Sequence, residues 1–256
     1  MSPSPDLLVA RHDAGLAWIT LNRPAKHNAL SRSLLGALAR AIRTAGADAT
    51  TRCIVLCGAG RHYFAAGGDL VDLGTVRTKA ATRRMVDEAS AALDAVRNCP
   101  VPVIAYLNGD ALGGGAELAV ACDIRVAAPH AHVGYVHGRL AITSAWGGGS
   151  DLCELVGSAR AMRMMARCES VDAATASAWG LVDAIVDDDA AVHAFVEPML
   201  ALSPLMLRGV KAQTRAWRDG LPRVARLAVE RDHIVATWVD DAHWLAVEGF
   251  LTRRRK

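Results

Sequence analysis

The chain has 256 residues, which is enough to bury a sizeable core, and at ~100–200 residues per domain it allows one large domain or two small ones. Hydrophobic residues make up 52% of the chain and charged residues 21%, and this balance excludes an intrinsically disordered protein. The net charge of +3 is too small to indicate nucleic-acid binding, and no apolar run approaches the ~18–20 residues of a membrane span.

The N-terminal segment and the cysteines indicate the cellular compartment in which we expect the protein. The chain opens without a basic stretch followed by an apolar one, so we expect no secretory signal. Six cysteines lie scattered in apolar or helical contexts, with no CxxC pair among them. These features favour a reduced, cytoplasmic protein.

Strand and helix patterns alternate through the first half of the chain. Short apolar strands run directly into glycine turns and helices, which favours an α/β fold with parallel pairing and both sheet faces covered. Ser31 is a suitable N-cap for the first helix. The patterns predict strands at 7–11, 16–21, 53–57, 103–107 and 122–127, and helices at 32–47, 77–97 and around Glu117.

From about Ala190 onward the pattern is helical, with Pro204 and Pro222 each beginning a helix. We therefore predict an α/β body over residues 1–190 and a helical module over 191–256. The basic tail, 253–256, suits a solvated helix end stabilised by the helix dipole. The alternative for this tail is a contact with an anionic ligand or a neighbouring subunit.

Two glycine-rich loops follow two of the expected strands, one at 63–70 and the other at 108–117. Glycine permits positive φ angles and close approach of a ligand to the backbone. Each loop leads into a helical segment whose first N–H groups are unpaired, and two such groups that converge on one point form an oxyanion hole. The alternative is a pair of tight strand-to-helix turns. Neither loop fits a dinucleotide-binding or P-loop motif.

The two loops and several flanking motifs resemble the crotonase (enoyl-CoA hydratase/isomerase) superfamily. The similarity extends over nearly the whole chain. The matching segments are 19–24 with 28–30, the Ala-Gly-Gly-Asp-Leu loop at 66–70, residues 108–109 and 113–118, residues 121–123, and residues 174–182.

The resemblance implies a spiral of ββα units, a homotrimer or dimer of trimers, and an acyl-CoA thioester as ligand. It implies no cofactor beyond the coenzyme A moiety of the substrate, and neither a nucleic-acid nor a membrane partner. By matching positions, the backbone N–H groups of Gly68 and Gly114 would bind the thioester oxygen. The segment of Lys26 and Ala29 would approach the nucleotide end of coenzyme A, where Lys26 would meet a phosphate. The alternative is that Lys26 is simply an exposed loop lysine. The path to the thioester would be lined by Ala66, Asp69 and Leu70.

Glu117 occupies the position of one of two catalytic glutamates in the hydratases. A carboxylate that faces a thioester suits proton transfer, although its position also suits a helix N-terminal carboxylate favoured by the dipole. The second glutamate is missing, because the aligned position holds His137. This histidine could act as a base or a donor. Alternatively, it only packs in the pocket wall.

Several residues resemble a narrower branch, the ethylmalonyl-/methylmalonyl-CoA decarboxylase-like crotonases. Loss of CO₂ from a malonyl-type thioester leaves an enolate, which the Gly68/Gly114 hole would stabilise. A second glutamate would repel the substrate carboxylate, whereas a histidine would not. The segments that carry this likeness are 136–137, 144–149, 157–161, 230–232 and 237–238.

The sequence therefore predicts an acyl-CoA lyase that works through a thioester enolate, with decarboxylation of a small 2-alkylmalonyl-CoA favoured over hydration of a 2-enoyl-CoA. Isomerisation is a further crotonase chemistry, and a CoA- or RNA-binding protein without catalysis is the non-enzyme alternative. Trp146 is either a core aromatic or a wall of the acyl pocket. The nine histidines show no metal-ligand spacing, so we expect no metal.

Overall fold

The computed structural model describes residues 6–253 and contains two β-sheets. The larger sheet has six strands in the order β1-β2-β3-β5-β7-β10, in which β1 and β2 pair antiparallel and the other neighbours pair parallel. These strands are β1 (Leu7–His12), β2 (Leu16–Leu21), β3 (Cys53–Gly58), β5 (Val103–Leu107), β7 (Ile124–Ala127) and β10 (Ala184–Ile185).

The smaller sheet has four short strands in the order β4-β6-β8-β9. Its pairings are parallel except for the antiparallel pair β8 and β9. The strands are β4 (Tyr63–Ala65), β6 (Asp110–Leu112), β8 (His132–Gly134) and β9 (Ser170–Asp172). Sequence analysis missed all four, because strands this short carry no readable alternation, and β4 and β6 lie within the two glycine-rich loops.

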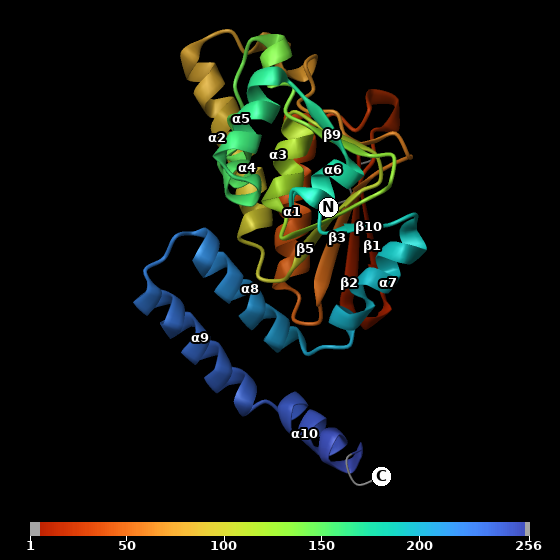
Figure 1. Cartoon of the computed structure of the whole chain (residues 1–256), viewed down its shortest axis with the longest axis vertical. Coiled ribbons are helices and arrows are strands. Elements are labelled where there is room, and N and C mark those ends of the chain that lie inside the picture. The colour runs from red at the N-terminus through yellow and green to blue at the C-terminus, as the bar shows by residue number, and fades with distance from the viewer. Residues whose placement is uncertain (1–5, 254–256) are drawn as a thin grey trace.

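The helices alternate with the strands in the first part of the chain and follow one another in the last part (Figure 1). They are α1 (Arg32–Ala47), α2 (Lys79–Arg97), α3 (Gly114–Ala121), α4 (Gly148–Val156), α5 (Ser158–Arg167), α6 (Ala173–Ala178), α7 (Asp189–Leu200), α8 (Pro204–Arg218), α9 (Arg223–Trp238) and α10 (Asp241–Arg253). Ser31 caps α1 as expected, with its side chain accepting a hydrogen bond from the N–H of Leu34. Pro204 opens α8, and Pro222 is the N-cap of α9.

One unit recurs along the chain: a strand of the larger sheet, a strand of the smaller sheet, and then a helix. The units β3-β4-α2, β5-β6-α3 and β7-β8-α4 each follow this order. Each turn of the spiral therefore brings the end of a large-sheet strand next to a short strand and a helix N-terminus. The predicted α/β spiral of ββα units is confirmed.

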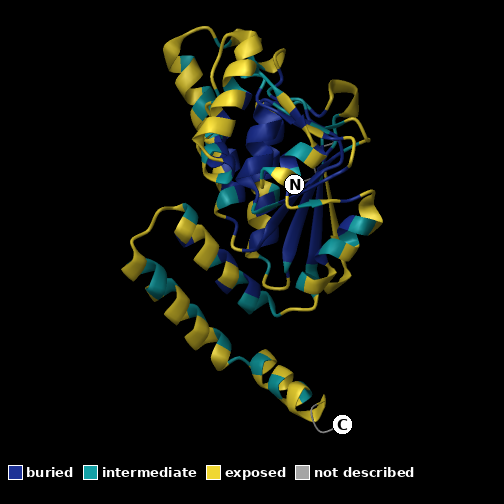
Figure 2. Cartoon of the chain, in the orientation of Figure 1, coloured by how far each residue is buried: buried dark blue, intermediate teal, exposed yellow. Residues whose placement is uncertain are grey.

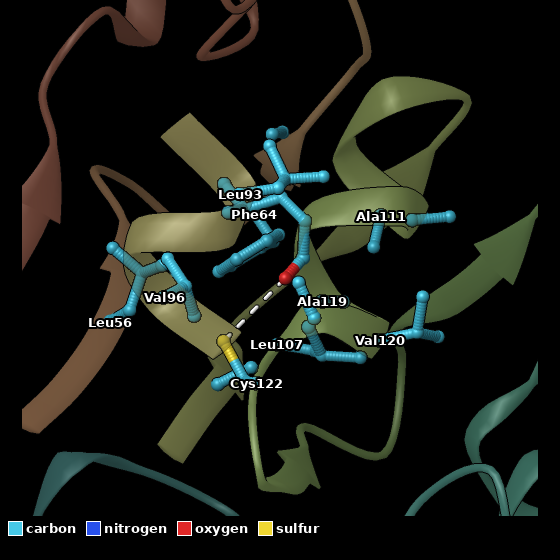
Figure 3. Packing of buried hydrophobic residues seen from close by; sticks show 14 of the residues in the cluster. Leu56, Phe64, Leu93, Val96, Leu107, Ala111, Ala119, Val120 and Cys122 are labelled. Atoms are coloured by element: carbon cyan, nitrogen blue, oxygen red, sulfur yellow. Dashed lines mark hydrogen bonds between the residues drawn. The ribbon is translucent and has the colours of Figure 1, made fainter. Parts of the chain in front are cut away.

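The central strands of the larger sheet, β2, β3 and β5, are buried on both faces, and their two-residue period divides the core. Ile19 and Leu56 point to the face covered by the first helices, whereas Trp18 and Val55 point to the face covered by α7. Figure 2 shows these strands as a buried layer inside the body. Figure 3 shows the larger cluster, in which Leu56, Phe64, Leu93, Val96, Leu107, Ala111, Ala119, Val120 and Cys122 pack together.

The C-terminal helices differ from the body in their exposure. The second core cluster includes Val192 and Val196 of α7, so this helix packs on the larger sheet although it lies within the predicted module. By contrast, α9 and α10 contain no buried residue and extend away from the body (Figures 1 and 2). The division at residue 190 stays a prediction, and of the predicted basic tail, residues 254–256 lie outside the described residues.

Within residues 6–253, no single helix is both long and apolar enough to cross a membrane. The pair α7 and α8, bent by 99°, meets the length and composition criteria only when the two helices are taken together. All six cysteines are free thiols, and burial raises the pKa of Cys53 and of Cys122 to about 12.

Asn28 ties the first glycine loop to the end of β3. Its side-chain oxygen accepts a hydrogen bond from the N–H of Arg23 at 3.0 Å. Its amide nitrogen donates to the carbonyls of Ala59 at 3.0 Å and Tyr63 at 2.8 Å. The residue is buried and has a φ of +54°, a conformation that asparagine adopts more readily than alanine.

We expect Asn28→Ala to lower the free energy of unfolding by about 2–4 kcal/mol, because it leaves three polar backbone groups without their partner and strains the left-handed residue. Urea denaturation followed by circular dichroism measures this loss. The matched control is Asn98→Ala at the exposed end of α2, which we expect to change stability by less than about 0.5 kcal/mol. Equal effects of the two substitutions would contradict this account of Asn28.

Candidate active site

A cavity of about 520 Å³ lies where the two glycine loops meet. Apolar side chains make most of its wall, and Glu117 and His137 are its only lining residues with ionisable side chains. Leu70, Leu140 and Ile142 are exposed at its mouth, whereas Trp146 is only 7% exposed. The cavity therefore suits a ligand with an apolar end that meets a few polar groups.

Gly68 forms a parallel bridge with Leu30 at one side of this cavity. In that bridge, the N–H of Leu30 donates to the Gly67 carbonyl at 2.7 Å, and the N–H of Asp69 donates to the Leu30 carbonyl at 3.0 Å. The pairing thus uses the atoms on either side of Gly68 and leaves the N–H of Gly68 itself out of the bridge. This N–H is available to a ligand in the cavity that Gly68 lines.

Gly114 is the first residue of α3, so its N–H has no partner within the helix. The preceding Gly113 has a φ of +53°, which turns the chain sharply into the helix. A Cβ atom on Gly114 would lie 2.2 Å from Cζ3 of Trp146, so no larger residue fits. The backbone of Gly67 comes close to this point, since a Cβ there would lie 3.5 Å from the Gly114 nitrogen. The two predicted donor loops are therefore neighbours in space.

Glu117 lies in the first turn of α3, and its side chain is only 2% exposed. Its Oε2 atom accepts hydrogen bonds from the N–H groups of Trp146 at 2.9 Å and Gly148 at 3.0 Å. Its Oε1 atom accepts a longer one from the N–H of Ala145 at 3.4 Å. We call the segment 145–148 the carboxylate cradle. The N–H groups of the cradle take the place of water around the buried carboxylate.

His137 stands directly beside this carboxylate. Its Nε2 atom lies 3.0 Å from Oε1 of Glu117, and its side chain is 13% exposed. A Cβ on Gly113 would lie 3.8 Å from the same Nε2 atom, so the imidazole is also next to the second glycine loop. The structure thus brings Glu117, His137, Gly68 and Gly114 to one cavity, as the sequence predicts.

Two residues that were not predicted from the sequence donate hydrogen bonds to carbonyl groups of the cradle. Arg97 donates from Nη2 to the Trp146 carbonyl at 3.0 Å and bonds Asp151 Oδ2 at 2.8 Å. Burial alone would lower the pKa of Arg97, but its contacts with Asp151 and Asp94 outweigh that effect and raise it. The buried Tyr135 donates its hydroxyl to the Gly148 carbonyl at 2.6 Å. No sequence motif marks this arrangement, because its members are far apart in the chain.

The residues predicted to contact coenzyme A lie in three different settings. Ala66 and Leu70 line the cavity. Lys26 is exposed at the end of a 3₁₀ turn, Pro24–Lys26, and Ala29 is half-buried nearby.

Asp69 points away from the cavity, and its Oδ2 atom pairs with Arg23 Nη2 at 2.7 Å. Burial would raise the pKa of Asp69, but the bonds from Arg23 and from the N–H groups of Asp72 and Val71 hold it below its usual value. This ion pair fixes the first glycine loop.

The arrangement combines backbone donors for a developing oxyanion with a carboxylate–imidazole pair that can hold one proton. Such a set suits chemistry in which a thioester passes through an enolate. Among residues 6–253, no group of three or more His, Cys, Asp or Glu side chains could hold a metal ion.

Known proteins are similar in sequence to this chain over most of its length. A family model described as enoyl-CoA hydratase/isomerase matches residues 11–255. The 2,3-dehydroadipyl-CoA hydratase of Escherichia coli is 32% identical over 252 residues, covering 97% of this chain and 96% of that protein. The ethylmalonyl-CoA decarboxylase of Gallus gallus is 28% identical over 254 residues, covering 97% and 83%. The mitochondrial methylglutaconyl-CoA hydratase of Rattus norvegicus is 34% identical over 188 residues, covering 72% of this chain but only 59% of that enzyme.

Solved structures agree with the sequence matches. An enoyl-CoA hydratase from Bacillus anthracis superposes with a TM-score of 0.89 at 29% identity, covering 97% of this chain and 96% of the other. A Thermobifida fusca protein solved in complex with CoA gives a TM-score of 0.81 at 28% identity, covering 91% and 93%. The fold, the paired glycine loops and the family match lead to one conclusion: the chain belongs to the enoyl-CoA hydratase/isomerase family.

Proposed function

We propose that the protein is an acyl-CoA lyase that forms a thioester enolate, and that it decarboxylates a small 2-alkylmalonyl-CoA. The observation that carries this proposal is the pairing of Glu117 with His137. A hydratase of this family holds its water between two carboxylates, and here the cavity offers one carboxylate, bound by an imidazole. The likeness to an ethylmalonyl-CoA decarboxylase, which covers 97% of this chain and 83% of that enzyme, supports the same reaction.

In the proposed reaction, the thioester oxygen accepts hydrogen bonds from the N–H groups of Gly68 and Gly114. The bond between Cα and the substrate carboxylate breaks, CO₂ leaves, and the electron pair moves onto the thioester as an enolate. The two N–H groups stabilise the negative oxygen, for which each donor contributes ~2.7–4 kcal/mol in comparable sites. A proton held between His137 and Glu117 then transfers to Cα, and the pair takes up another proton from solvent.

The apolar lining of the cavity favours the departure of CO₂. Apolar groups such as Leu73, Val86 and Val136 line it, so a substrate carboxylate is poorly solvated there, while the product is neutral. The N–H groups of the cradle stabilise the charge of Glu117, which partly offsets its repulsion of the substrate. These features favour loss of the carboxylate over its retention.

Hydration of a 2-enoyl-CoA is the second candidate. It is favoured by the relatives named as hydratases, two of which match this chain at 32% and 34% identity. In that reaction His137 would take the place of the second carboxylate and orient the water. Both candidates use the same oxyanion donors, so the product distinguishes them.

We also propose that coenzyme A runs from the cavity mouth at Leu70 towards Lys26, whose exposed ammonium suits a phosphate. A homotrimer or dimer of trimers is proposed as well. In support, α8–α10 expose large apolar side chains, among them Trp217, Val235, Val239 and Leu245. Of these helices, α9 and α10 contain no buried residue, and exposed apolar side chains of this kind indicate a protein partner.

The reaction itself is tested by the products. We expect the wild type to release CO₂ from methylmalonyl- or ethylmalonyl-CoA and to hydrate crotonyl-CoA poorly, as measured by mass spectrometry of the thioesters. His137→Glu places a second carboxylate beside Glu117 and the substrate. Two like charges at ~4 Å cost up to ~4 kcal/mol at an effective dielectric of ~20, so we expect decarboxylation to be lost.

His137→Gln is the matched control, because it removes the imidazole without adding charge. We expect it to retain substrate binding that His137→Glu loses. Rapid hydration of crotonyl-CoA by the wild type, with no CO₂ from malonyl-type thioesters, would exclude the decarboxylase and favour the hydratase.

We expect Glu117→Gln to lower kcat by ~10²–10⁴-fold with little change in thioester affinity, because the amide keeps the shape of the carboxylate but cannot hold the proton. Steady-state kinetics and calorimetric titration with a product thioester measure the two effects. Glu154→Gln on the exposed side of α4 serves as the control and should leave both unchanged. An unaltered kcat in Glu117→Gln would assign Glu117 a purely structural role.

For the assembly, light scattering should give a mass of three or six chains for the wild type. We expect the double substitution Val235→Asp and Leu245→Asp to shift the protein to smaller species, since each carboxylate would be buried at the contact. Leu8→Asp, on the exposed side of β1, should leave the mass unchanged. A monomeric wild type would contradict the proposed assembly.

A further inference from the structure

Trp146 lies against both predicted oxyanion donors. A Cβ atom on Gly114 would meet Cζ3 of its indole at 2.2 Å, and one on Gly68 would lie 3.6 Å from Cη2. The six-membered ring therefore spans the Cα atoms of the two glycines. An acyl group whose thioester oxygen is bound at these glycines has its α-carbon within contact distance of the indole.

The position of the indole within the cavity sets the direction of the acyl chain. The mouth is exposed at Leu70 and Leu140, whereas Trp146 is buried and lies against the two glycines. A thioester that enters from the mouth and reaches the glycines thus directs its acyl end towards Trp146. A longer acyl chain would therefore meet the indole.

Behind this wall lies a second, much smaller space of about 10 Å³. Leu73, Met85 and Trp146 line both spaces, so the indole forms the partition together with these two side chains. The far side of the small space is apolar, with Leu30, Leu35 and Ala89, and it ends at an ion pair in which Arg32 Nε lies 2.6 Å from Glu88 Oε2. Removing the partition would extend the cavity along an apolar path.

The backbone of Trp146 makes hydrogen bonds that are independent of its side chain. Its N–H binds Glu117 and its carbonyl accepts a hydrogen bond from Arg97. These contacts hold the residue in place, and they do not depend on the side chain. A substitution that keeps the backbone can therefore change the acyl wall while leaving the contacts of the cradle available.

We infer that Trp146 is the specificity-determining residue that closes the acyl end of the cavity and restricts the substrate to short acyl groups. This inference rests on the proposed acyl-CoA function, but not on which reaction follows binding. Each buried methylene contributes about fourfold in affinity, so a chain that gains access to the space behind the indole should bind more tightly as it lengthens.

The test uses binding of saturated thioesters that undergo neither decarboxylation nor hydration. Calorimetric titration of the wild type with butyryl-CoA and octanoyl-CoA should show preference for butyryl-CoA. In Trp146→Leu we expect the ratio of octanoyl to butyryl affinity to rise at least tenfold. Trp179→Leu is the control, because this tryptophan packs under Arg160 and Arg163 and does not line the cavity, and its ratio should equal that of the wild type.

If Trp146 has a purely structural role, Trp146→Leu weakens the binding of both thioesters equally. An unchanged ratio of octanoyl to butyryl affinity overturns the inference, while the proposed function stands. Should Trp146→Leu fail to fold, Trp146→Met provides the same ratio with a flexible side chain that fills part of the space. A wild type that binds no acyl-CoA at all would overturn the proposed function and this inference together.

Discussion

The carboxylate of Glu117 is a charge inside a helix whose eight residues are all buried. Removing a carboxylate from water costs several kcal/mol unless hydrogen bonds replace its hydration. The N–H groups of the cradle provide that replacement, and hydrogen bonds to a charged group contribute ~1.5–3 kcal/mol each. Because the cradle is a loop, its geometry depends in turn on Arg97, Asp151 and Tyr135.

The residues that make up the site come from successive units of the spiral. Glu117 comes from the unit β5-β6-α3, whereas His137 and the cradle belong to the segment between β8 and α4. The first donor loop, with Gly68, belongs to the unit β3-β4-α2. Each turn of the spiral thus contributes one element to the cavity, and the parallel pairing of β4, β6 and β8 brings those elements together.

Sequence analysis predicted what depends on local pattern. The bounds of α1 agree with the prediction because Ser31 and the apolar periodicity mark them, and the glycine loops were recognised by composition and family resemblance. It assigned α2 a start two residues too early and missed the short strands, for which tertiary pairing rather than propensity decides the conformation. It also missed Arg97 and the role of the cradle, since their contacts join residues 28 to 54 positions apart.

The replacement of a carboxylate by His137 has a consequence for the whole site. Two ionised carboxylates at this distance would each need their own compensation, and the cradle supplies N–H groups to one only. An imidazole at this position, with Nε2 at 3.0 Å from Oε1 of Glu117, adds no second negative charge. The pair can then carry one proton without an uncompensated charge in an apolar cavity. The proposed decarboxylation rests on this difference, because its substrate would bring its own carboxylate and lose it, whereas hydration would need water held between two anions.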